Sequence, residues 1–151
     1  MAGEYLLATD GTETSRASEN YISKILDPED TTIHLLHVVE RFNRDELSEI
    51  SLGLDLDEIE RHREEKSREL LEPIADRLLE QGFRIKTQVV HGNSGEEICQ
   101  RAEELNVDGI FIGRGQHSRL GEMFMGSVSR YVVLNSDRSV IVTPVREDLE
   151  E

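Results

Sequence analysis

Five short apolar runs recur along the chain, and polar segments separate them. A turn signal closes several of these runs, such as Asp10-Gly11 after the first and His91-Gly92 after the third. The run at residues 32–39 is nearly continuous, as is typical of a parallel strand that is buried on both faces of a sheet. The pattern therefore predicts five strands, at residues 5–9, 32–39, 84–90, 109–112 and 139–145.

The segments between these runs place apolar residues at the three-to-four residue spacing of an amphipathic helix. Ser94 also offers a helix start, because its hydroxyl can form a capping box with Glu97 three residues later. The pattern predicts helices over residues 12–26 and 57–81, after Ser94, and from about Ser127.

Strands that alternate with helices favour an α/β fold, in which right-handed crossovers place helices on both faces of one open, parallel sheet. The 151 residues suffice for a single domain, which we assign to residues 1–146, followed by an acidic tail at residues 147–151. Residues 40–56 show no firm period and are interpreted as a loop or lid. Ligands bind such sheets beyond the carboxyl ends of the strands, so the loops there are the place to seek a functional site.

The charge balance limits the classes of molecule that the protein can bind. The chain carries 32 acidic and 17 basic residues, a net charge of −15, and such a surface repels the phosphates of nucleic acids. No apolar run is long enough to span a membrane, and the first residues lack the features of a secretion signal. The single cysteine, Cys99, can form no internal disulfide. The sequence thus favours a cytoplasmic protein without nucleic-acid or membrane partners.

The acidic surface also predicts that stability depends on salt. Only three of the basic residues are lysines, and the excess carboxylates should repel one another until ions screen them; the Debye length falls from about 10 Å at about 0.1 M to about 3 Å at about 1 M. Such a surface suits a halophilic protein, and an ordinary acidic protein is the alternative. We expect the thermal unfolding midpoint to rise between low and molar KCl. A flat or falling midpoint would contradict the halophilic interpretation.

One glycine-rich segment, IGRGQHSRLGEMFMGSVS, stands between a predicted strand and a predicted helix. Gly113 and Gly126 allow the backbone to approach a phosphate closely, and Ser127 suits the N-cap position of the helix. The first turn, with Val128 and Ser129, offers free N–H groups and the positive end of the helix dipole to an anion, and the serine hydroxyls can add donors. The same residues could serve only to turn the chain and cap the helix, so a phosphate-binding role and a purely structural role both stay open.

The chain resembles the universal stress protein family over nearly all of its length. The resemblance rests on LLATDGTETS, IHLLHVVE, VVHGNSGEEI, DGIFIGRG, GSVS and SVIVTPV. It implies a Rossmann-like sheet in the strand order 3-2-1-4-5 and a homodimer formed through the C-terminal strand, residues 139–145. Nucleotide-binding members carry the motif G-x2-G-x9-G-[ST] after the fourth strand, and here Gly113 and Gly126-Ser127 fall at the expected spacing.

The same resemblance implies an ATP site. Asp10 would lie beside the ribose and base or help to hold a phosphate-bound Mg or Mn ion, and it could also simply make the turn with Gly11. Ala8 and Thr9 would border the adenine, and the backbone of Val38 would read the edge of the base. The remaining contacts would come from Gly113, Arg114, Gly115, Gln116, Gly126, Ser127, Val128 and Ser129.

Gln116 stands where the family motif has its second glycine. If that position needs a positive φ, glutamine costs about 1–2 kcal/mol; if it needs close approach, the side chain intrudes on the phosphate. We favour a third reading, in which Gly115 takes over the turn and Gln116 swings outward or donates its amide to a phosphate. Arg114 can offset phosphate charge, yet Arg114 and Gln116 also suit a relative that has lost nucleotide binding.

No catalytic constellation is evident in the sequence, which has no Walker motif, no HExxH motif and no Cys–His pair. We therefore predict an ATP-binding, dimeric sensor or regulator of a stress response rather than an enzyme with fast turnover. Two alternatives stay open: a dimeric interaction module of the same fold that binds no nucleotide and, less favoured, a slow nucleotide hydrolase.

Overall fold

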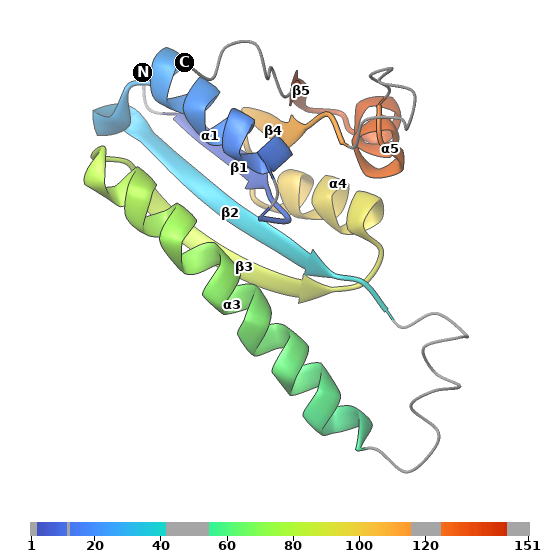
Figure 1. The fold of residues 1–151 in the computed structure, drawn as a ribbon. Coiled ribbons are helices and arrows are strands. Elements are labelled where there is room, and N and C mark those ends of the chain that lie inside the picture. The colour runs from blue at the N-terminus through green and yellow to red at the C-terminus, as the bar shows by residue number, and fades with distance from the viewer. Residues whose placement is uncertain (1–2, 12, 42–54, 116–124, 145–151) are drawn as a thin grey trace.

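The computed structural model describes residues 3–11, 13–41, 55–115 and 125–144. Its strands pair in parallel in one sheet of order β3-β2-β1-β4-β5, as Figure 1 shows. The expected α/β fold and strand order are thus confirmed. The strands are β1 (Gly3–Ala8), β2 (Thr31–Val39), β3 (Arg84–His91), β4 (Gly109–Gly113) and β5 (Ser139–Thr143).

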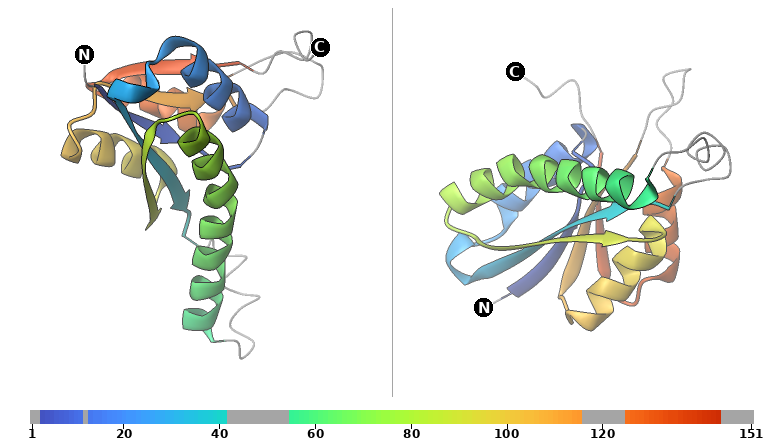
Figure 2. Two further views of the ribbon diagram at one scale, coloured as in Figure 1. Left: turned by 90° about the vertical axis from the view of Figure 1, so that its left-hand side faces the viewer. Right: turned by 90° about the horizontal axis from the view of Figure 1, so that it is seen from below.

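Helices cover both faces of the sheet (Figure 2). Leu6 of β1 packs in a core cluster with residues of α4 and α5, whereas the next residue, Leu7, packs in a second cluster with residues of α1 and α3. This alternation is the period of two that a strand imposes on its side chains. None of the helices in the described ranges has the length and hydrophobicity that a membrane crossing requires. The helices are α1 (Glu13–Ile25), α3 (Leu56–Glu80), α4 (Ser94–Glu104) and α5 (Ser127–Asn135), with a 3-10 turn, η1, at Pro28–Asp30.

Several element boundaries differ from the prediction by one or two residues, as in β1, which spans Gly3–Ala8 and not residues 5–9; two of these differences have a clear physical cause. Asn93, not Ser94, caps α4: its backbone is extended, and its side chain accepts a hydrogen bond of 3.1 Å from the backbone N–H of Glu96. An Asn side chain at this position satisfies an N–H of the first turn as well as serine does, so the helix starts one residue earlier. β5 ends at Thr143 because Pro144 has no N–H to donate to a neighbouring strand; the predicted last residue, Val145, lies outside the described residues.

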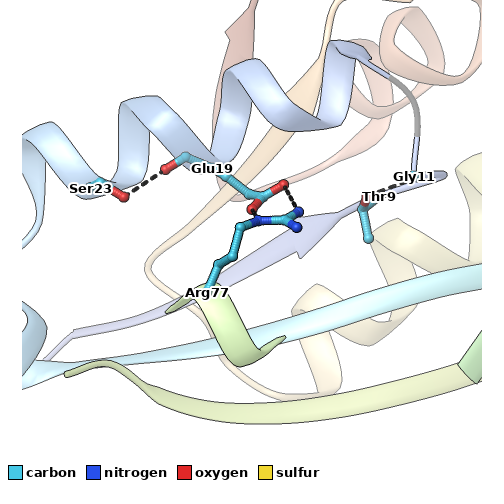
Figure 3. Close-up of polar contacts among 5 residues, drawn as sticks. All are labelled: Thr9, Gly11, Glu19, Ser23 and Arg77. Carbon is cyan, nitrogen blue, oxygen red and sulfur yellow. Dashed lines mark hydrogen bonds and ion pairs between the residues drawn. The ribbon is translucent and has the colours of Figure 1, made fainter. Parts of the chain in front are cut away.

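A buried ion pair joins the two helices on one face of the sheet. Glu19 of α1 is 5% exposed, and both of its carboxylate oxygens accept hydrogen bonds from Arg77 of α3, at 2.9 Å from Nε and 3.1 Å from Nη2 (Figure 3). The hydrogen bonds from Arg77 to Glu19 raise the pKa of the Arg77 guanidinium above its usual value. Bidentate pairs of this kind fix orientation as well as charge, so the pair sets α1 against α3.

The α3 helix is packed along only part of its length. It runs for 25 residues and continues through Pro73, but its buried residues begin at Ser67. The preceding turns, residues 56–66, extend beyond the sheet, as the left view of Figure 2 shows. The packed half carries Leu71, Ile74 and Leu78, which lie in the core under this face.

Candidate functional site

A cavity of about 670 Å³ opens at the carboxyl ends of β1, β2 and β4 and at the N-terminal end of α5. Volumes of this size are typical of small-molecule sites. The cavity lies where the chain order reverses, because β2 flanks β1 on one side and β4 flanks it on the other. Open α/β sheets bind their ligands at such a switch point, so the position agrees with the expectation from the order of elements.

Most residues that the sequence suggested come together here. Arg114 stands between two lining glycines without being part of the lining, and Gln116 lies outside the described residues, so no reading of its side chain is tested. The suggested residues that line the cavity are Ala8, Thr9, Asp10, Val38, Gly113, Gly115, Gly126, Ser127, Val128 and Ser129.

The cavity also has lining residues that sequence reasoning missed. Glu40 and Ser94 follow the ends of β2 and β3, and the rule that loops after parallel strands meet at one edge could have found both. The apolar members show no signal that separates them from ordinary core residues. The missed residues are Ser15, Leu36, His37, Glu40, Ser94, Ile98 and Ile112.

The peptide groups around Arg114 hold the two ends of the glycine-rich segment together. The Arg114 N–H donates to the carbonyl of Thr143 in β5 at 2.9 Å, and the Arg114 carbonyl accepts from the N–H of Gly126 at 2.8 Å. The same carbonyl accepts from the hydroxyl of Ser129 at 2.9 Å. We call these three hydrogen bonds the Arg114 clasp. The clasp fixes the start of α5 beside the end of β4 through bonds that do not involve residues 116–124.

Gly115 has a backbone conformation that favours glycine. Its φ is +104°, in the region that L side chains rarely adopt. A Cβ added to Gly115 would lie 2.8 Å from both Cα and N of Gly126, far inside contact distance. This conformation is consistent with the prediction that Gly115 takes over the turn, which stays a prediction because Gln116 lies outside the described residues.

The start of α5 differs from the prediction in its capping. Gly126, with φ −66° and ψ 162°, is the N-cap, and no side chain of the described residues caps the helix; Ser127 is already the first helical residue. The expectation that Ser127 is the N-cap is therefore wrong, because the extended backbone needed at the cap falls one residue earlier. The N–H groups of the first turn keep the dipole end of the helix available to an anion.

The hydroxyl of Ser129 is used within the protein. Ser129 is 2% exposed, and its hydroxyl lies 2.9 Å from the Arg114 carbonyl and 3.0 Å from the Gly126 carbonyl. A hydroxyl carries a single proton, so this side chain has none left for a ligand. The expectation that Ser129 supplies a hydroxyl donor needs correction: the geometry gives the side chain a role in holding the loop.

A tight turn aims Asp10 at the cavity. The hydroxyl of Ser15 accepts the Asp10 N–H at 3.1 Å and donates to Asp10 Oδ1 at 3.0 Å. Gly11 follows with φ +79°, and its N–H donates to the hydroxyl of Thr9 at 3.1 Å (Figure 3). The turn-making and ligand-facing roles of Asp10 are thus compatible. Its carboxylate suits hydroxyl donors or a hard cation.

His37 adds an imidazole next to this carboxylate. Burial lowers the pKa of His37, and the nearby charge of Asp10 offsets part of that effect. The ring is consequently neutral at pH 7, since its pKa lies below the usual value of about 6.5. Its Nδ1 is buried without a hydrogen-bond partner among the described residues.

The described residues contain no group of three or more His, Cys, Asp or Glu side chains that could hold a metal ion. Asp10 and Glu40 are the carboxylates among the described residues of the cavity lining, and Asp10 is the one that follows β1. Magnesium bound to a nucleotide commonly keeps several waters and takes few protein ligands, so the residues present fit a phosphate-bound ion held through Asp10 and do not form a dedicated metal centre.

Comparisons with known proteins agree with the fold. The model of the universal stress protein family matches residues 1–144. Universal stress protein MJ0577 of Methanocaldococcus jannaschii is 27% identical over 153 residues, which cover 94% of each chain. The solved structure of MJ0577 superposes with a TM-score of 0.82 and covers 97% of this chain and 98% of that one.

Two more distant structures share the fold. A universal stress protein family protein from Arabidopsis thaliana, solved with AMP bound, is 16% identical, with a TM-score of 0.69 over 99% of this chain and 95% of that one. A universal stress protein in complex with cAMP is 18% identical, with a TM-score of 0.63 over 95% of this chain and 98% of that one. With the family model matched from residue 1 to residue 144, the chain belongs to the universal stress protein family.

Proposed function

We propose that the protein binds an adenine nucleotide, ATP, in the cavity at the switch point. The observation that carries this proposal is the uncapped N-terminal end of α5, which opens into the cavity and is framed by Gly113, Gly115 and Gly126. A helix end of this kind favours an anion through its N–H groups and dipole. Glycines without side chains let the phosphates approach the backbone.

The rest of the cavity suits the nucleoside. Asp10 is placed to accept hydrogen bonds from ribose hydroxyls or to hold a phosphate-bound Mg or Mn ion, which would neutralise phosphate charge. Ala8, Leu36, Val38 and Ile98 give apolar walls for a base. The AMP and cAMP complexes of distant relatives support an adenine nucleotide as the class of ligand for this fold.

The geometry favours binding over turnover. Activation of a water molecule needs a positioned base within reach of the scissile phosphate; the sequence shows no catalytic motif, and the titratable side chains among the described lining residues are Asp10, His37 and Glu40. We therefore infer a cytoplasmic sensor or regulator of a stress response whose state changes with the nucleotide. A slow hydrolase remains the less favoured alternative.

The experiment that tests binding is mass spectrometry of the purified protein after denaturation, followed by calorimetric titration of stripped protein with ATP. We expect ATP or another adenine nucleotide to co-purify and ATP to rebind at one site per chain. Neither co-purified nucleotide nor a titration signal would favour the alternative of an interaction module. That module is suggested by Gln116 and Arg114, but Arg114 does not line the cavity.

We also propose a homodimer formed through residues 139–145. β5 is an edge strand, and its residues Val140, Ile141 and Val142 are half-buried in the single chain. Antiparallel pairing with β5 of a second copy would cover this edge, which would otherwise promote aggregation. We expect Val142→Lys to halve the mass measured by light scattering, because it places like charges at the pairing edge; circular dichroism checks that the variant is folded. A folded variant of unchanged mass would contradict the prediction.

A further inference from the structure

The ends of three neighbouring strands present different chemistry to the cavity. The glycine-rich backbone follows β4, Asp10 follows β1, and Glu40 follows β2, and these strands are adjacent in the sheet (Figure 1). Neighbouring strands lie about 4.8 Å apart, so the ends of β4 and β2 are separated by about 10 Å. Phosphate, ribose and base follow one another over a comparable length in a nucleotide. If the phosphates occupy the end of α5, the base lies near Glu40.

Glu40 is held by two different helices. Its backbone carbonyl accepts a hydrogen bond of 2.9 Å from Nη2 of Arg63 in α3. Its carboxylate oxygen Oε1 accepts a hydrogen bond of 2.8 Å from the hydroxyl of Ser94 at the start of α4. A carboxylate only accepts hydrogen bonds and has lone pairs for several donors, so the bond to Ser94 orients the group and leaves Oε2 for a ligand. Such anchoring is how a protein pre-organises a binding group.

Glu40 is a second carboxylate, besides Asp10, in a cavity that we propose for a polyanion, so it needs a hydrogen-bond donor from the ligand. Negative charge near the phosphates weakens their binding unless it meets hydrogen-bond donors. Asp10, over β1, is placed to meet the ribose hydroxyls, whereas the N–H donor that the base of an adenine nucleotide offers is its exocyclic amino group. The apolar side chains of Leu36, Val38 and Ile98 line the same cavity and suit the faces of a ring. Glu40 is thus the charged acceptor at the end of β2 that is suited to receive an amino group, in addition to the backbone of Val38.

We propose that Glu40 determines base specificity: its carboxylate, oriented by Ser94, accepts a hydrogen bond from the exocyclic amino group of adenine. This inference rests on the proposed nucleotide site. It predicts that the protein prefers ATP to purine riboside triphosphate, which lacks the amino group and otherwise keeps the same sugar and phosphates. Hydrogen bonds to charged groups correspond to a preference of about tenfold to a hundredfold.

The test is calorimetric titration of both nucleotides into the wild type, Glu40→Ala and Glu40→Gln. Removing the charge of Glu40 should change the affinity for both nucleotides alike, so the ratio of the two dissociation constants isolates the contact with the amino group. We expect a ratio of at least about ten in the wild type, a ratio near one in Glu40→Ala, and an intermediate ratio in Glu40→Gln, which keeps an acceptor oxygen without its charge.

Glu96→Ala is the matched control. Glu96 lies in the first turn of α4, two residues after Ser94, and its side chain is exposed and does not line the cavity. The Glu96→Ala variant removes one negative charge from the same neighbourhood and should keep the wild-type ratio of the two dissociation constants. Circular dichroism establishes whether each variant is folded. If Glu40→Ala does not fold, the more conservative change Glu40→Gln provides the test.

Each other outcome is distinguishable. A wild-type ratio near one, or an unchanged ratio in folded Glu40→Ala or Glu40→Gln, overturns the role of Glu40 while ATP binding itself stands. An equal fall of the ratio in Glu96→Ala overturns it as well, because charge alone would then explain the effect. Failure of the wild type to bind either nucleotide overturns the proposed function and this inference with it.

Discussion

Gly115→Ala should weaken ATP binding by at least about a hundredfold, which corresponds to about 2.7 kcal/mol. The added Cβ would lie 2.8 Å from backbone atoms of Gly126, and the φ of +104° disfavours any L side chain. Backbone cannot move aside as a flexible side chain can, so the end of β4 and the start of α5 must separate. That separation breaks the hydrogen bond from Gly126 to the Arg114 carbonyl and displaces the N–H groups that would face the phosphates. Calorimetric titration with ATP measures the loss.

Gly82→Ala provides a control with the same backbone strain in another place. Gly82 follows α3 with φ +102°, and among the described residues a Cβ there would meet only Pro28, at 3.4 Å. We expect a loss of stability of about 1–2 kcal/mol and an affinity for ATP within about threefold of wild type. Gln116→Gly should leave the affinity within about tenfold. If folded Gly115→Ala binds ATP as the wild type does, the junction of Gly115 and Gly126 has no part in the site.

Arg77→Ala should have the largest effect on stability, about 3 kcal/mol. Glu19 is 5% exposed and receives both of its strong hydrogen bonds from Arg77, so the variant leaves a buried carboxylate without its partner. The Arg77 side chain is 34% exposed, which places the expected loss at the lower end of the range for broken buried pairs. For a chain of this size the melting temperature should fall by about 6–12 °C. Urea unfolding at fixed protein concentration measures the difference.

Arg68→Ala is the matched change on the same helix. Arg68 pairs with Glu64 at 2.8 Å, but its side chain is 63% exposed, and exposed pairs of this spacing contribute about 0.3–0.5 kcal/mol. Glu19→Gln should also cost less than Arg77→Ala, because it leaves behind a cation with access to water instead of a buried anion. Equal losses for Arg77→Ala and Arg68→Ala would mean that burial of Glu19 adds nothing to the pair.

The central strands could be predicted because β1, β2 and β4 are largely buried on both faces, whereas the edge strand β3 is mostly exposed. Residues such as Ile33 and Leu35 of β2 are fully buried, and a continuous apolar run is the direct consequence. Element ends were less predictable. Asn93 and Ser94 both suit a helix start, and only the backbone conformation decides between them. β5 stops before Pro144, where the apolar pattern alone continues to Val145.

The candidate site was predictable where it depends on residue type and spacing, and not where it depends on tertiary bonds. Gly113, Gly126 and Asp10 stand at turns that the order of elements places at one edge of the sheet. Two hydrogen bonds of the Arg114 clasp join the peptide groups of Arg114 to those of Thr143 and Gly126. Every residue has backbone groups of this kind, so the residue types do not reveal these bonds. Glu40 was missed because it opens a segment without hydrophobic period, although its contacts with Arg63 and Ser94 come from two regular helices.

The unequal burial along α3 implies unequal protection against local opening. Fraying costs little where no side chain is buried, as in residues 56–66, and approaches the global free energy of unfolding near Leu71, Ile74 and Leu78. Amide protons should therefore exchange with solvent in a gradient along one continuous helix. Arg63 lies in the turns that carry no buried side chain, and it donates to the Glu40 carbonyl. Fraying of these turns would therefore break one of the two hydrogen bonds that hold Glu40. The fast-exchanging turns of α3 and the proposed specificity residue Glu40 would then lose their fixed positions together.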